Sequence, residues 1–110
     1  MIGAAVIVVL AGLLIVWIAI RGWQGRLSRN FFAGVRTPST MRSDDAFRIA
    51  NKTAAPFSLA AGLLFIVSGA VTAVAEHHTA SVALPAGVVI AAIVAVAGGV
   101  KGVRAARAAP

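Results

Sequence analysis

The sequence predicts an all-α integral membrane protein, with three transmembrane helices and a short amphipathic cytoplasmic helix between spans one and two. Three observations predict this fold: hydrophobic residues make up 60% of the 110 residues, charged residues make up 12%, and the mean hydropathy is +0.95. A soluble domain of this length exposes much of its chain, so it needs more polar surface than this sequence provides. We therefore expect a single three-span membrane domain over residues 1–110.

The first span is expected over about residues 2–20, a run without charge. At a rise of about 1.5 Å per residue, this run is long enough to cross the hydrocarbon of a bilayer. The alternative is a cleaved signal peptide, which has a basic segment before a shorter apolar run and a small-residue cleavage site. Here Trp17 and Trp23 lie near the end of the run, as interfacial anchors do, so we expect a retained span.

The second span is expected over about residues 54–75 and the third over about 81–100, joined by an outer turn at 76–79. Pro56 and Pro85 lie near the expected starts, where proline removes no intrahelical hydrogen bond. The third span is rich in alanine, valine and glycine and is only moderately hydrophobic. We expect it to enter the bilayer as a hairpin with the second span.

The distribution of lysine and arginine predicts the orientation. All ten of these residues lie in the loop 21–53 or in the basic tail 101–110. Because basic loops stay in the cytoplasm, we expect the loop and the C-terminus there and the N-terminus outside. The net charge of +7 flanks apolar runs instead of covering a soluble face, so the expected partner is a bilayer with anionic headgroups and not nucleic acid.

The predicted spans contain no Asp, Glu, Lys, Arg or His. Such groups mark proton relays, ion paths and substrate sites, so the sequence gives no support for a pump or a proton-coupled transporter. Small residues suggest close helix packing, either within one subunit or in a homo-oligomer. The expected packing residues are Ser58, Gly62 and Gly69 in span two and Gly87, Ala91, Ala95 and Gly99 in span three.

No residue pattern predicts catalysis, a metal site or a cofactor. Glu76, His77 and His78 form the one histidine-bearing cluster, but adjacent histidines point about 100° apart on a helix and further ligands are not evident. A solvated turn is the favoured interpretation, and a metal site is the alternative. The sequence arranges no acid–base partner for a nucleophile and no glycine-rich phosphate loop, so we expect no enzyme.

The segment 34–52 has the most specific polar pattern. Gly34 permits unusual backbone angles, and Thr37-Pro38 is typical of a turn. One interpretation is that the arginines of the loop only set topology and bind lipid. We favour an ordered recognition element for this segment, with Arg36 folding back on an aspartate.

A short helix is predicted next, starting after Ser43. Ser43 is a good N-cap, and Asp44 and Asp45 follow in the first turn, where the helix dipole favours acids. Asp44 and Arg48 are spaced for an i,i+4 ion pair, while Phe47 lies on the apolar face. The residues that we expect to bind a partner or to structure the loop are Asn30, Gly34, Arg36, Thr37, Pro38, Ser43, Asp44, Asp45, Phe47, Arg48, Asn51 and Lys52.

The stretch "RNFFAGVRTPSTMRSDDAFRIANK" resembles the signature of the SdpI-type (SdpI/YfhL) membrane protein family. The matching residues are Asn30, Gly34, Arg36, Thr37, Pro38, Thr40, Ser43, Asp44, Phe47, Asn51 and Lys52. The resemblance covers the three-span module and implies a bacterial inner-membrane protein. The family's namesake role is immunity against a secreted peptide toxin, coupled to holding a transcriptional repressor at the membrane.

Two function hypotheses follow. The first is a small non-enzymatic protein of immunity or signalling type whose ordered cytoplasmic loop binds a protein partner. Under the resemblance, Arg36, Thr37, Pro38, Asp44, Arg48 and Lys52 form that binding face. The alternative is an accessory subunit packed against a larger membrane protein complex.

Overall fold

The computed structural model describes residues 2–26 and 34–108 and is helical, with no strand in these ranges. Its elements are α1 (Ile2–Trp23), α2 (Pro38–Met41), α3 (Asp44–Val74) and α4 (His77–Ala108). Three of the helices, α1, α3 and α4, are long and apolar enough to cross a membrane. The predicted all-helical architecture is thus confirmed, with three helices that are long and apolar enough to be the predicted spans.

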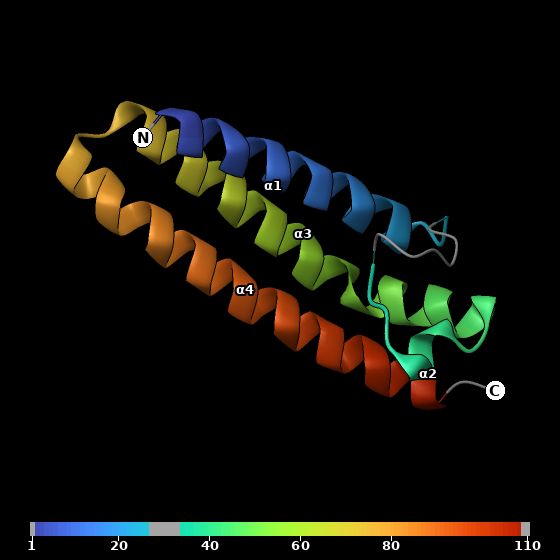
Figure 1. Ribbon diagram of the computed structural model, residues 1–110. Helices are drawn as coiled ribbons and strands as arrows, with labels where there is room; N and C mark the ends of the chain where they lie inside the picture. The colour runs from blue at the N-terminus through green and yellow to red at the C-terminus, as the bar shows by residue number, and fades with distance from the viewer. Residues whose placement is uncertain (1, 27–33, 109–110) are drawn as a thin grey trace.

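The three long helices lie side by side with α3 in the middle (Figure 1). α3 packs against α1 on one side and against α4 on the other, whereas the described residues of α1 and α4 do not approach each other closely. The molecule is elongated, with extents of 52 × 20 × 19 Å. The end of α1, α2, the start of α3 and the end of α4 meet at one end, which we call the cationic end because the described lysines and arginines lie there.

The helix boundaries extend past the expected spans. α3 begins at Asp44 and runs without interruption to Val74, so residues 44–53 are its first turns and not a separate amphipathic helix. Pro56 consequently lies inside α3 instead of in a first turn. The helix begins early because the Ser43 hydroxyl accepts a hydrogen bond from the Ala46 N–H at 3.0 Å.

The turn between α3 and α4 is shorter than expected. α4 already begins at His77, so Ala75 and Glu76 alone separate the two helices. The Glu76 carbonyl accepts the Ala80 N–H at 2.9 Å, and its carboxylate accepts the Thr79 hydroxyl at 3.2 Å. Glu76 therefore stabilises the first turn of α4.

Glycines bring α1 and α3 together. A Cβ added at Gly12 would lie 2.8 Å from the carbonyl oxygen of Gly62, and one added at Gly69 would lie 2.9 Å from that of Ala5. Both distances are shorter than real Cβ contacts, so the two backbones touch only because side chains are missing. This is the close approach that small residues provide in membranes, and it agrees with the predicted packing role of Gly62 and Gly69.

The α3–α4 interface is also built from small residues, but with a different periodicity from the one expected. Gly87 faces Ser68, Ala91 is fully buried, and a Cβ at Gly102 would lie 2.6 Å from the Ala50 carbonyl oxygen. The predicted residues Ala95 and Gly99 do not contribute, since Ala95 is exposed and nothing lies within 4 Å of a Cβ at Gly99.

The reason is geometric. Four residues of an α-helix turn through about 400°, so a strict four-residue repeat drifts by about 40° at each step. The residues of α4 that lie against α3 are separated by steps of four, seven and four residues, which keep them on one face of the helix. They are Gly87, Ala91, Gly98 and Gly102. Gly98, which lies against Phe57, continues that face, whereas Gly99 has rotated away from it.

Burial is uneven along the molecule. Within their most apolar windows, α1, α3 and α4 are 17%, 28% and 17% buried, so most of their side chains are left to contact lipid. At the cationic end, by contrast, Ala46, Ala50 and Ala106 form a fully buried cluster. Phe47 and Thr40 are the largest fully buried side chains, and they lie in the same region.

Candidate functional site

The candidate site is the folded segment at the cationic end, residues 34–52, which we call the cap. It comprises an extended entry at Gly34–Arg36, the single turn of α2 and the first turns of α3. Gly34 has a φ of 95°, a left-handed conformation that residues with a Cβ rarely adopt. The conformation expected from the sequence at this glycine is therefore present.

Thr37 and Thr40 hold α2 through reciprocal hydrogen bonds. The Thr37 hydroxyl accepts the Thr40 N–H at 3.2 Å, and the Thr40 hydroxyl accepts the Thr37 N–H at 2.7 Å. The Thr40 hydroxyl also donates to the Val35 carbonyl at 2.9 Å. This capping box, with Pro38 at the start of the helix, closes one helical turn where the sequence predicted only a turn.

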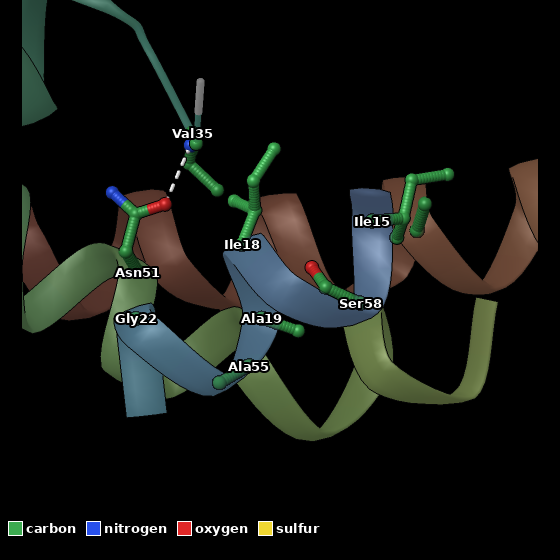
Figure 2. A pocket seen from close by; sticks show the side chains of 10 residues that line it. Ile15, Ile18, Ala19, Gly22, Val35, Asn51, Ala55 and Ser58 are labelled. Carbon is green, nitrogen blue, oxygen red and sulfur yellow. Dashed lines mark hydrogen bonds between the residues drawn. The ribbon is translucent and has the colours of Figure 1, made fainter. Parts of the chain in front are cut away.

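Asn51 attaches the entry of the cap to α3. Its Oδ1 accepts the Val35 N–H at 2.7 Å (Figure 2). Its Nδ2 donates to the Phe47 carbonyl at 2.9 Å. Asn51 is only 6% exposed; its bond to Phe47 is buried and its bond to Val35 is partly buried. Its backbone carbonyl lies against Gly22, where an added Cβ would be 3.2 Å away, so α1 closes over it.

Two arginine contacts join the cap to the end of α4. The Arg42 guanidinium donates to the Ala106 carbonyl, and Arg107 Nε donates to the Ser39 hydroxyl at 3.2 Å. The Ala106 carbonyl belongs to the last turn of α4, where backbone acceptors have no intrahelical donor. The entry of the cap is thus fixed to the first turns of α3 by Asn51, and the cap is fixed to the end of α4 by Arg42 and Arg107.

The outer face of the cap is polar. Asp45 and Arg48 form an ion pair at 3.0 Å with side chains that are 72% and 53% exposed, respectively. The sequence predicted that Arg36 folds back on an aspartate and that Asp44 and Arg48 form an i,i+4 pair. In the structure Arg48 pairs with Asp45 instead, at i,i+3. The exposed residues of the outer face are Arg36, Pro38, Arg42, Asp44, Asp45, Arg48 and Lys52.

The predicted site residues therefore divide into two groups. Gly34, Thr37, Ser43, Phe47 and Asn51 shape the cap from within. Arg36, Pro38, Asp44, Asp45, Arg48 and Lys52 lie on its exposed face. Asn30 lies outside the described residues. The contributions of Arg42, Ala106 and Arg107 were not predicted, because contacts between residues so distant in sequence leave no local pattern.

A groove lies beside the cap, over the part of α3 that is between α1 and α4; we call it the central groove. It has a volume of about 270 Å³. Figure 2 shows Asn51, Ala55 and Ser58 of α3 beside Ile15, Ile18, Ala19 and Gly22 of α1. Gly34, Val35 and Ala95 complete the lining. Ser58, predicted as a packing residue, lies half-buried in the lining of this groove.

No group of three or more His, Asp or Glu side chains in residues 2–26 and 34–108 could hold a metal ion. His77 and His78 are exposed in the first turn of α4, at the end opposite the cap. The exposed polar groups of the cap can form hydrogen bonds and charge pairs.

A comparison with known protein families matches residues 26–99 to the SdpI/YfhL protein family. The match covers more than half of the chain and includes the whole cap, all of α3 and most of α4. A comparison with curated proteins and one with solved structures found no match. The chain belongs to the SdpI/YfhL family and is a multi-pass membrane protein, as the sequence resemblance predicted.

Proposed function

We propose that this protein is a non-enzymatic immunity or signalling protein of a bacterial inner membrane, and that the exposed face of its cap binds a protein partner. The single observation that carries the proposal is the separation of roles within the cap. Inward-facing groups satisfy the hydrogen bonds of the segment, while charged residues of both signs remain on a fixed outer surface. A tether that only connected two spans would need neither feature.

Protein recognition needs such fixed groups. Arg36, Asp44 and Lys52 are exposed and project from backbone that is held by Asn51 and Ser43. Preorganised side chains lose less conformational entropy on binding than the same side chains on a flexible loop. Charges of both signs also give orientation and partner selectivity.

The proposed orientation places the cap in the cytoplasm. Every described lysine and arginine lies at the cationic end, whereas Glu76 lies in the α3–α4 turn at the opposite end. This asymmetry follows the positive-inside rule, which sets the orientation of multi-pass proteins with short loops. The N-terminus and the α3–α4 turn then face outward.

The proposal is tested by exposing a deletion strain to a secreted peptide toxin while it expresses Arg36→Ala or Asp44→Ala. We expect both variants to insert at the wild-type level and to lose protection or the dependent signal. His77→Ala is the matched control, because it changes an exposed residue at the opposite end. Full protection by both cap variants would contradict the proposal.

The central groove supports a second candidate function, an accessory subunit of a larger membrane complex. Among the described helices, α1 and α4 leave one face of α3 uncovered, and Ser58 is small enough there for close helix approach. This candidate predicts copurification with a larger membrane protein in fixed ratio after mild detergent extraction. Ser58→Phe, which fills the groove, should abolish that copurification, whereas Arg36→Ala should not.

A further inference from the structure

A second groove lies on α4 at the cationic end, on the side that faces residues 35–37 of the cap; we call it the lateral groove. Its volume is about 520 Å³. Its lining residues are Val35, Thr37, Val96, Gly99, Val100, Val103, Arg104 and Arg107. The apolar residues occupy the part nearer the middle of α4, and the two arginines occupy the outer end.

Gly99 keeps the groove open. Nothing lies within 4 Å of a Cβ built at this position, so the glycine is not required for helix packing. Exposed Val96 and Val100 flank the space that its missing side chain leaves. The interval from Val96 to Arg107 corresponds to about 16 Å along the helix axis, enough for a phosphate group and the first carbons of an acyl chain.

The lining of the lateral groove contains two arginines and no Asp or Glu, so the polar end of the groove is positively charged. Asp45 pairs with Arg48, and Glu76 lies at the other end of the molecule. Arg107 is oriented by its Nε bond to Ser39, which leaves its two terminal nitrogens for another acceptor. The C-terminal dipole of α4 is equivalent to about −0.5 charge, so it offsets only a fraction of the two guanidinium charges.

We propose that the lateral groove binds one anionic phospholipid, with its phosphate between Arg104 and Arg107 and an acyl chain along Val96, Gly99 and Val100. The positive charge of the two arginines favours an anionic headgroup. The lining has no acidic residue that could pair with the cationic group of a zwitterionic lipid. The apolar lining distinguishes a lipid from free phosphate. Val96, Gly99 and Val100 can contact an acyl chain, whereas phosphate has no apolar surface to bury against them. Because the cap forms one wall through Val35 and Thr37, the lipid would also fix the cap against α4.

The test is native mass spectrometry of the full chain released from detergent, titrated with phosphatidylglycerol and with phosphatidylcholine of equal chain length. Wild-type protein should retain one phosphatidylglycerol in preference to phosphatidylcholine. Arg104→Gln and Arg107→Gln should each weaken phosphatidylglycerol retention about fivefold, the effect of one basic residue near a membrane surface. Gly99→Leu should weaken retention of both lipids, because its side chain fills the acyl part of the groove.

The matched control is Arg21→Gln/Arg26→Gln, which removes the same charge from the end of α1. Equal loss in this control and in Arg104→Gln/Arg107→Gln would overturn the proposal in favour of general electrostatic attraction. Competition by inorganic phosphate at the same concentration as the lipid, or unchanged retention in Gly99→Leu, would also overturn it. Gly99 makes no packing contact, so Gly99→Leu should fold normally and remains an informative variant.

Discussion

The cap and the membrane-spanning part of the molecule are stabilised in opposite ways. In the spans, helices touch through glycine and alanine, and large side chains such as Ile7, Val67 and Ile93 are 68%, 58% and 64% exposed. In the cap, Phe47 and Thr40 are fully buried, and hydrogen bonds from Asn51 and Thr40 hold the backbone. The spans are therefore held by close backbone contact between helices, and the cap is held by a buried core and hydrogen bonds.

The difference follows from the two solvents. Lipid tails are as apolar as leucine, so spanning helices gain little from burying large side chains and instead gain from close backbone contact. The cap lies where water competes for its polar groups, so it needs a buried core and satisfied backbone hydrogen bonds. This contrast predicts that substitutions at helix interfaces affect the whole protein, whereas those in the cap act locally.

The largest effect is expected at the α1–α3 interface. Gly62→Leu places side-chain atoms where a Cβ alone would lie 2.8 Å from Val16 Cγ2 and 3.0 Å from the Gly12 carbonyl oxygen. Overpacking against backbone cannot be relieved by a rotamer change, so we expect a loss of about 3 kcal/mol in the free energy of unfolding. Thermal and SDS unfolding in mild detergent measure it. Gly3→Leu is the control, because its Cβ meets nothing within 4 Å; equal destabilisation by both variants would refute the interface.

A smaller and local effect is expected from Asn51→Leu. The leucine has a similar volume but cannot accept the Val35 N–H, so the entry of the cap detaches from α3. We expect a cost of about 1–3 kcal/mol for opening the cap, the range for a buried polar group left without a partner. Amide exchange at Thr40 and Met41 should accelerate while α4 exchanges as before. Lys52→Leu, one residue away and exposed, should leave exchange unchanged; uniform acceleration across all helices would show that the cap and spans are one unit.

Ser43→Ala should shorten the start of α3. The substitution removes the acceptor of the Ala46 N–H, and loss of such a cap costs about 1 kcal/mol. The effect should appear as faster exchange at Ala46 and Phe47 and as a slightly lower Tm. Ser58→Ala changes a serine that caps no helix and should have no such effect. If the two variants behave alike, the helix does not begin at Ser43.

The smallest effect on stability is expected from Arg48→Ala. Its ion pair with Asp45 is exposed to water and joins residues one turn apart, so its contribution is at most about 0.5 kcal/mol. The same variant should nevertheless weaken partner binding, because it removes a charge from the outer face of the cap. Thermal denaturation measures the effect on stability, and copurification from the same preparation measures the effect on partner binding. A large drop in Tm would show that the pair is structural.

The sequence predicted the spans and the polar cap, because hydropathy and capping are local properties. Ser43 and Gly34 were recognised from residue type alone, and the structure gives them the expected roles. Contacts between residues far apart in sequence were not predictable. Nothing near Arg42 indicates that it contacts Ala106. The prediction of Gly99 instead of Gly98 failed for a different reason, because a strict four-residue repeat does not follow the 3.6-residue period of a helix.

The most direct test of the central claim, that the cap is an ordered surface, is amide hydrogen exchange of the wild-type protein in a lipid bilayer disc. The Val35 amide donates to Asn51, whereas the neighbouring Arg36 amide donates to no acceptor among the described residues. We predict that Val35 exchanges at least about tenfold more slowly than Arg36, as a bond worth about 1.4 kcal/mol requires. Equal exchange of both amides at the rate of an unfolded chain would contradict the account, since the segment would then be a tether.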